Sequence, residues 1–240
     1  MRETNGAADA GDPAADDGEG GTGERPRLLV DIVSDPVCPW CYVGLKSFQH
    51  ARDRISDAFQ VLPRIRAYQL NPDTPVEGVD RAAYYAKKFP DETQRAQMIH
   101  ALKAAAAGAG FQFDPLTPKR LPNTLRAHQL IRLAHYSGAQ ERIADMICDA
   151  YWNKGADIGD VETLVALAEN AGLAADNARQ IITNEDNAAE IKTEAAHFRD
   201  AGVTGVPTFI VNERTGFSGA LPPSRLADAL KEAAARTGLH

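Results

Sequence analysis

The sequence predicts an α/β fold whose strands lie toward the two ends of the chain, with a long helical insertion between them. Three observations carry this prediction. An apolar strand followed at once by a helix lies near one end, and a helix, two strands and a last helix lie near the other. Between Asn71 and about Thr183 no segment has a convincing strand pattern. The 240 residues, 44% of them hydrophobic, suffice for one large domain or a domain with an insertion.

The N-terminal unit begins with the apolar, β-branched run Leu28–Val33, which prolines bound on both sides and which predicts a buried strand. From Pro39 to about Phe59, apolar residues recur at helical spacing with charges between them, and this pattern predicts a helix. A second strand is expected from about Val61 to Tyr68. The chain therefore starts with a strand, a helix and a strand.

The next segment predicts amphipathic helices separated by glycines, at about residues 94–107, 124–136, 140–153, 161–171 and 176–182. A longer helix is expected over Ala188–Ala201, then a strand at Thr208–Val211, another near Phe217 and a final helix over Ser224–Arg236. These elements divide the chain into three parts. Residues 1–26 form a disordered acidic tail, residues 27–70 and 185–240 form one domain with the strands, and residues 71–184 form a helical insertion.

The first 26 residues contain no Val, Ile, Leu or Phe and are rich in Gly, Ala, Asp and Glu, a composition typical of a flexible segment. Seven acidic and two basic residues give this tail −5 of the chain's formal charge of −7. The remainder is near neutral and has no basic cluster. We therefore expect no nucleic-acid partner.

The residues after Met1 lack the basic and apolar regions of a secretory signal, and no apolar run reaches the length that spans a bilayer. These patterns favour a cytoplasmic protein without a membrane partner, and they leave its oligomeric state open. Three cysteines, two of them in one short motif, do not make a disulfide scaffold. In a reducing compartment such a pair is typically catalytic or metal-binding.

Cys38 and Cys41 stand at the start of the first predicted helix, at a spacing that a disulfide can bridge. A thiolate at a helix N-terminus is stabilised by free backbone N–H groups and the helix dipole, so we expect Cys38 to be the acidic, exposed nucleophile. Pro39 suits the first helical position, and Trp40 completes the motif. Cys41, one turn further in and less exposed, is suited to resolve a mixed disulfide.

A zinc site is the alternative reading of two cysteines at this spacing, and it needs two more ligands. The sequence has no second pair of this kind, and none of its six histidines has a paired ligand spacing. We therefore expect no metal and no cofactor other than the redox-active disulfide. Glutathione is a candidate co-substrate.

The chain resembles the DsbA family and looks most like its FrnE-like branch, which is associated with polyketide biosynthesis. The segments that carry this resemblance are Asp31–Gly44, Tyr68–Asp73, Asn123–His128 and Val203–Pro207. The resemblance implies a thioredoxin fold with a helical domain inserted between the second strand and the helix preceding the cis-Pro loop. It also implies that the bond between Val206 and Pro207 is cis and faces the cysteines, with the Val206 backbone free to pair with substrate. Ser218–Leu221 departs from the pattern of this branch.

Five further residues are candidates for a role at or near this site. Asp31 could accept a proton from Cys41, although an aspartate facing solvent is the favoured reading, and Asp35 is expected to form a cap or turn. Asn71 and His128 lie in segments resembling the groove of related glutathione-using enzymes, where they could bind substrate, although such residues are usually helix caps or surface histidines. Cys148, alone in a predicted helix, is expected to pack as a small apolar residue.

The favoured function is thiol-disulfide exchange with protein or small-thiol substrates, as oxidase, reductase or isomerase. The alternative is a glutathione-dependent isomerase or transferase of the 2-hydroxychromene-2-carboxylate isomerase or kappa type. Those families generally carry serine at the position of Cys38 and lack the second cysteine, so the pair favours redox chemistry. A third reading is a chaperone or binding module that uses the same groove without catalysis.

Overall fold

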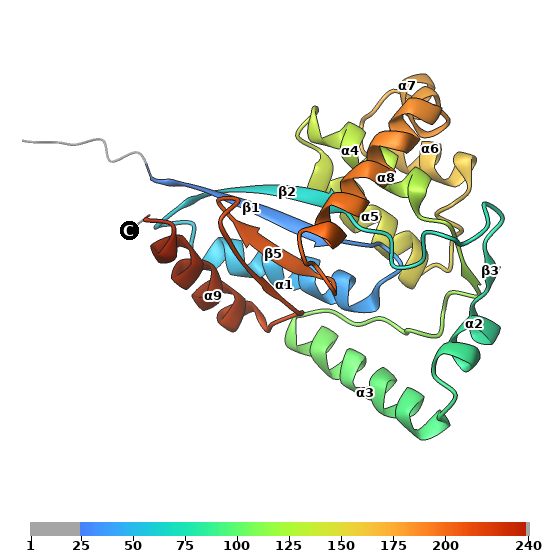
Figure 1. Cartoon of the computed structure of the whole chain (residues 1–240), viewed down its shortest axis with the longest axis horizontal. Coiled ribbons are helices and arrows are strands. Elements are labelled where there is room, and N and C mark those ends of the chain that lie inside the picture. Colours follow the sequence, from blue (N-terminus) through green and yellow to red (C-terminus); the bar gives the residue numbers. More distant parts are fainter. Residues whose placement is uncertain (1–24, 239–240) are drawn as a thin grey trace, which may run out of the picture.

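The structure is a computed structural model that describes residues 25–238 and is built around one four-stranded sheet (Figure 1). The strand order is β2-β1-β5-β6, with bounds Gln60–Ala67, Arg27–Ser34, Thr208–Val211 and Thr215–Ser218. β1 pairs with β2 in parallel and with β5 in antiparallel orientation. The predicted acidic tail, residues 1–26, lies almost entirely outside the described residues and stays a prediction.

Helices cover both faces of this sheet. α1 (Pro39–Arg54) and α9 (Pro223–Arg236) pack together on one face, where Phe48 and Leu230 are fully buried against β1 and β5 (Figure 1). α8 (Glu185–Asp200) packs on the other face through Phe198. β1 is buried along most of its length because it lies between two strands and two helical layers, which explains its nearly continuous apolar run. This arrangement is the thioredoxin fold.

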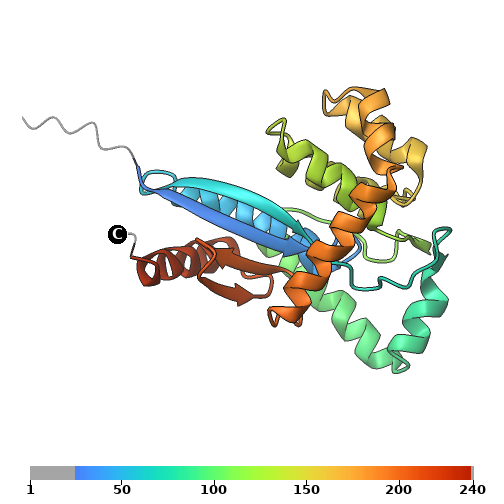
Figure 2. The ribbon, with the colours of Figure 1, turned by 45° about the horizontal axis from the view of Figure 1, so that its top comes forward.

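The helical insertion has two parts, which lie on opposite sides of the end of β1 (Figure 2). The first part is a hairpin of α2 (Arg81–Lys88) and α3 (Glu92–Gly108). The second is a bundle of α4 (Leu125–His135), α5 (Gln140–Trp152), α6 (Val161–Asn170) and α7 (Ala175–Ile182). The five helices predicted in this region are present, with ends within two residues of those expected.

Two features of the insertion differ from the sequence prediction. α2 was not predicted, and the expectation of no strand between residues 71 and 183 is wrong, because β3 (Val79–Asp80) pairs with β4 (Arg120–Leu121). Each strand has only two residues, too few for a periodic pattern. The pair joins the two ends of the segment that carries α2 and α3.

The ends of two sheet-covering helices also differ from prediction for local reasons. α1 ends at Arg54 rather than Phe59, because the chain turns at Ile55, whose N–H donates to the Arg52 carbonyl at 3.1 Å. α8 begins three residues earlier than expected because the Asn184 side chain caps it, accepting from the Asn187 N–H. In the described part of the chain, no helix is long and apolar enough to cross a membrane.

Candidate active site

The cysteine pair lies where β1 ends and α1 begins. Cys38 is the N-cap of α1, and its carbonyl accepts from the N–H groups of Cys41 and Tyr42 at 3.0 and 3.2 Å. Pro39 occupies the first helical turn, where its missing N–H has no helical partner to lose. The sequence prediction of a helix starting at this motif is confirmed.

Cys38 faces the loop before β5. Its thiol donates to the Val206 carbonyl at a sulfur–oxygen distance of 3.6 Å, and the Val206–Pro207 peptide bond is cis. The expectation that Cys38 is exposed is wrong, because only 5% of the residue is accessible. The accessible part lines a cavity beside the sheet, so a reactant reaches this sulfur through that cavity.

Helix α1 holds the cis-proline loop at close range through Gly44. A Cβ built on Gly44 would lie 2.7 Å from Cγ of Pro207. The ring of Pro207 packs directly against the helix backbone at Gly44, and this contact places Val206 opposite Cys38. The motif and the loop, which the resemblance placed face to face, are therefore together in the structure.

Cys41 lies behind Cys38 and is 97% buried, with 3% of its surface accessible. Burial raises the pKa of the Cys41 thiol well above its usual range, and the neighbouring Cys38 thiol raises it further. The backbone N–H of Asp35 donates to its sulfur at 3.5 Å. Cys41 is therefore a protonated thiol that must lose its proton before it can attack.

Asp35 and His128 form a buried pair next to Cys41. One carboxylate oxygen of Asp35 accepts from the Leu70 N–H at 2.8 Å, and the other lies 3.6 Å from Nε2 of His128. Within the described residues, these last two atoms have no hydrogen-bond partner, although both side chains are 1% exposed. His128 comes from α4, so this pair joins the helical bundle to the cysteine motif. The expectation of a surface histidine is wrong.

Asp31 neither faces solvent nor borders Cys41. It is 5% exposed, so the solvent-facing reading is wrong, and its carboxylate accepts two hydrogen bonds from Arg64 at 2.6 and 2.7 Å. Arg64 is its register partner on β2, and Arg66 lies 3.8 Å away. Asp31 thus forms an ion pair across two strands, and the carboxylate that borders Cys41 belongs to Asp35.

Asn71 and Cys148 serve packing in the structure. The Asn71 side chain accepts a hydrogen bond from the Tyr84 hydroxyl and so ties the chain after β2 to α2. Cys148 is buried in the core of the helical bundle, where burial raises the pKa of its thiol. It packs as the small apolar residue that the sequence predicted.

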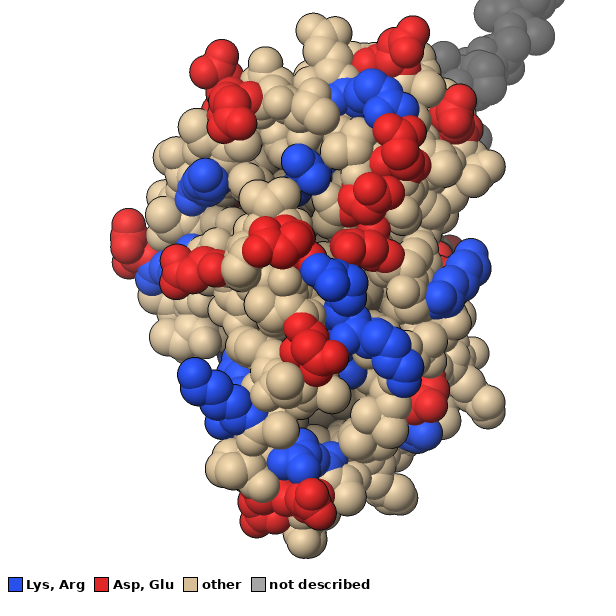
Figure 3. Space-filling view, turned by 90° about the vertical axis from the view of Figure 1, so that its right-hand side faces the viewer, with Lys and Arg blue, Asp and Glu red and all other residues tan. Residues whose placement is uncertain are grey.

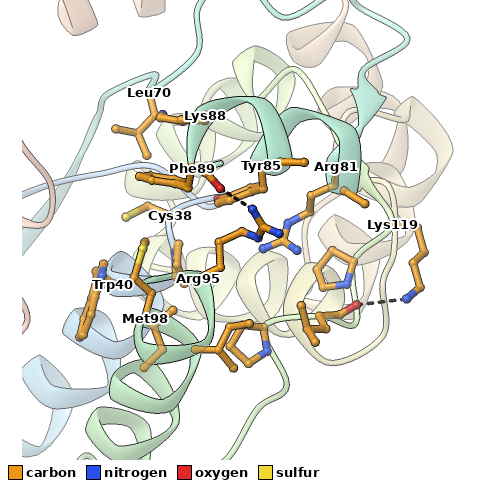
Figure 4. Close-up of a pocket in the computed structure, with 18 of the residues that line it drawn as sticks. Cys38, Trp40, Leu70, Arg81, Tyr85, Lys88, Phe89, Arg95, Met98 and Lys119 are labelled. Carbon is orange, nitrogen blue, oxygen red and sulfur yellow. Dashed lines mark hydrogen bonds between the residues drawn. The ribbon is translucent and has the colours of Figure 1, made fainter. Parts of the chain in front are cut away.

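The cavity beside Cys38 has a volume of about 650 Å³ and is enclosed by the α2–α3 hairpin (Figure 4). Trp40 of the motif forms one wall, and Tyr85 of α2 and Phe89, which follows α2, lie across from it. Arg81 and Arg95 extend into the space from α2 and α3 (Figure 4). Neither Asn71 nor His128 lines this cavity. Sequence analysis missed the cavity because α2, which forms one side of it, was not predicted.

Known proteins resemble this chain over most of its length. The Bacillus subtilis protein YwbO, described as uncharacterised, is 25% identical over 187 residues, which are 77% of this chain and 86% of YwbO. The crystal structure of a probable DsbA oxidoreductase from Streptomyces coelicolor has a TM-score of 0.75 and 29% identity, over 86% of this chain and 89% of that one. A 2-hydroxychromene-2-carboxylate isomerase shares the fold, with a TM-score of 0.66 and 14% identity over 88% and 98% of the two chains.

The family model of the DsbA-like thioredoxin domain matches residues 29–231. This range includes the cysteine motif, the helical insertion and the cis-proline loop. The chain therefore belongs to the family of DsbA-like thioredoxin domains.

Proposed function

We propose that this protein is a thiol-disulfide oxidoreductase of the FrnE-like branch, with Cys38 as nucleophile and Cys41 as resolving cysteine. The observation that carries the proposal is the asymmetry of the pair. Cys38 caps α1 and lines the cavity, whereas Cys41 is enclosed behind it. Exchange chemistry requires one sulfur that meets the substrate and a second that reaches only the first.

In the reducing direction, the Cys38 thiolate attacks one sulfur of a substrate disulfide. The substrate S–S bond breaks, one substrate thiolate leaves and takes up a proton, and Cys38 is joined to the other half. Cys41, once deprotonated, attacks the Cys38 sulfur, and the second substrate thiol leaves. Two electrons have then passed from the dithiol to the substrate. Two glutathione molecules return them by becoming glutathione disulfide, and the oxidising direction is the reverse sequence.

The Cys41 thiol must be deprotonated before it attacks, and the structure offers groups that can accept its proton. The raised pKa of Cys41 makes a base necessary at neutral pH. Asp35 borders this thiol and points an oxygen without a hydrogen-bond partner at His128. We assign the Asp35–His128 pair the role of receiving this proton and holding it while Cys41 attacks.

We propose that the protein acts mainly as a reductase or isomerase in a reducing compartment. Asp35 is fully buried beside the cysteine motif, and its carboxyl group contributes to the raised pKa of the Cys41 thiol, so it disfavours the Cys41 thiolate. A destabilised thiolate makes the dithiol a better reductant. The potential should therefore be more reducing than the value of about −120 mV that is typical of DsbA.

The second candidate function is the glutathione-dependent isomerase reaction, because an isomerase of that class shares the fold. The presence of Cys41 behind Cys38 favours exchange, since isomerisation has no use for a resolving thiol. Equilibration of the protein in glutathione redox buffers, with the Cys38–Cys41 disulfide quantified by mass spectrometry, tests the proposal. The expected result is a reversible two-electron transition at a potential below −120 mV. A pair that stays reduced at every glutathione ratio, in a protein that isomerises a chromene carboxylate, would overturn it.

A further inference from the structure

The cavity beside Cys38 has chemical features that disulfide exchange as such does not require. We propose that it binds a small, largely apolar molecule that carries a carboxylate together with the reacting thiol or disulfide. This proposal rests on the proposed function and names its substrate class.

The size and lining of the cavity fit a small organic molecule. Its volume of about 650 Å³ lies within the range of about 300–1,000 Å³ that is usual for such sites. The aromatic rings of Trp40, Tyr85 and Phe89 and the side chain of Met98 provide flat and adaptable apolar surface (Figure 4). An aromatic or alicyclic body suits these walls.

The position of Cys38 limits the bulk of what can react there. Only 5% of this residue is accessible, and the accessible part is at the wall of the cavity below the α2–α3 hairpin. The α2–α3 hairpin lines the same cavity as this sulfur, which favours a small reactant over a folded protein. A molecule small enough to enter the cavity meets the sulfur directly.

Arg81 is the feature that calls for an anion. It is 8% exposed, and its guanidinium lies over the rings of Tyr85 and Trp152, at 4.6 and 5.1 Å from their centroids. Its Nε has no hydrogen-bond partner, and none of the ion pairs among residues 25–238 includes it. A buried cation without a counter-charge is unfavourable, and a bound carboxylate would supply both the charge and the acceptor.

The charge around the cavity supports the same assignment. Four of its lining residues are cationic, namely Arg81, Lys88, Arg95 and Lys119, whereas Asp80 alone is acidic. The Asp80 carboxylate already accepts from the Ala83 N–H as the cap of α2. Figure 3 shows Lys and Arg side chains gathered around a hollow in the lower part of the face that carries α2. This field attracts a small anion toward Cys38.

A pair of matched aromatic disulfides tests the proposal, namely 4,4′-dithiodibenzoic acid and its neutral bis-carboxamide. Stopped-flow absorbance follows the release of the aromatic thiol when each probe reacts with the reduced protein. The expected result is a preference of about tenfold to a hundredfold for the carboxylate, which corresponds to a charge-assisted hydrogen bond. Arg81→Gln should bring this preference close to one, because it should slow the reaction with the carboxylate much more than the reaction with the carboxamide.

Two variants separate a specific contact from other causes. Lys87→Gln removes the same charge from the same helix, at an exposed residue that does not line the cavity, and should keep the preference. Arg81→Lys keeps the charge and should keep part of the preference for the carboxylate. Equal loss of preference in Arg81→Gln and Lys87→Gln would overturn the proposal, since only long-range attraction would then remain. Equal loss of both rates in Arg81→Gln would also overturn it, because Arg81 would then be structural.

Binding of unreactive 2-naphthoate and 2-naphthamide, followed by ligand-observed NMR, gives a second readout on the wild-type protein. The proposal requires the acid to bind more tightly than the amide, and equal binding would contradict it. If both disulfides react through Cys38 without preference, this inference fails and the proposed function stands. If neither reacts, or if Cys38→Ser reacts as fast as wild type, the proposed function fails.

Discussion

The contact between Gly44 and the cis-proline loop gives a prediction that links stability to activity. A Cβ at Gly44 would lie 2.7 and 3.3 Å from two ring carbons of Pro207 and 3.7 Å from the ring of Phe209. The proline ring is held in its loop and cannot turn aside as a flexible side chain would. Gly44→Ala should therefore push helix α1 and the loop apart and widen the distance between Cys38 and Val206.

The magnitude follows from two opposing effects. Replacing a mid-helix glycine with alanine stabilises a helix by about 0.5–1 kcal/mol. Overpacking a well-filled contact costs about 1–3 kcal/mol. The second effect is larger, so we expect Gly44→Ala to lower the free energy of unfolding by about 1 kcal/mol and Tm by about 2–4 °C.

Gly108→Ala is the matched control, because Gly108 is also helical and a Cβ there meets nothing within 4 Å. Thermal and urea unfolding should rank the variants with Gly108→Ala at or above wild type and Gly44→Ala below it. Disulfide reduction should fall in Gly44→Ala alone. If Gly44→Ala is as stable and as active as Gly108→Ala, the claim that this contact positions the loop is refuted.

Three further predictions concern the buried groups. The amide side chain of Gln140 donates to the Ile65 carbonyl and accepts from the Ile65 N–H at 3.0 and 2.9 Å, so Gln140→Ala should lower the free energy of unfolding by about 1–3 kcal/mol in urea unfolding. Gln140→Glu should lower it at least as much, because it sets a buried carboxylate oxygen against the Ile65 carbonyl. The raised pKa values of Cys41 and Cys148 mean that the unfolded chain releases these protons first as pH rises. The reduced protein should thus lose stability between pH 8 and about 9.5, and Cys148→Ala should lose less; an equal slope in both would contradict this. Asp35→Asn should slow the attack of Cys41 on a mixed disulfide in quenched-flow experiments, without slowing the first attack by Cys38; equal effects on both steps would count against a proton-accepting role.

Local signals in the sequence were enough to predict the parts of the fold that depend on local interactions. The strand Thr208–Val211 was predicted with the bounds that the structure shows, because a proline precedes four residues of high β-propensity. The start of α1 followed from Pro39 and the position of the cysteine pair. The bundle helices followed from apolar periodicity and glycine breakers.

The missed parts depend on contacts between residues that are far apart in the chain. The pairing of Asp31 with Arg64 depends on the register of β1 with β2, which no local pattern encodes. The approach of His128 to Asp35 depends on how α4 docks on the cysteine motif. The burial of Cys38 results from a loop and a hairpin that come from other parts of the chain. A histidine among the apolar residues of a predicted helix was the one local sign that α4 contributes a buried polar group.

The division of roles between Cys38 and Cys41 is tested most directly by trapping a mixed disulfide with Cys41→Ser. Without a resolving thiol, one half of the substrate should remain attached through a mixed disulfide, and mass spectrometry of the digested adduct should locate it on Cys38. Cys38→Ser should form no adduct, and Cys148→Ala should behave as wild type, since Cys148 is enclosed in the helical core. An adduct on Cys148, or on Cys41 in the Cys38→Ser variant at the rate that Cys38 shows, would contradict the assignment.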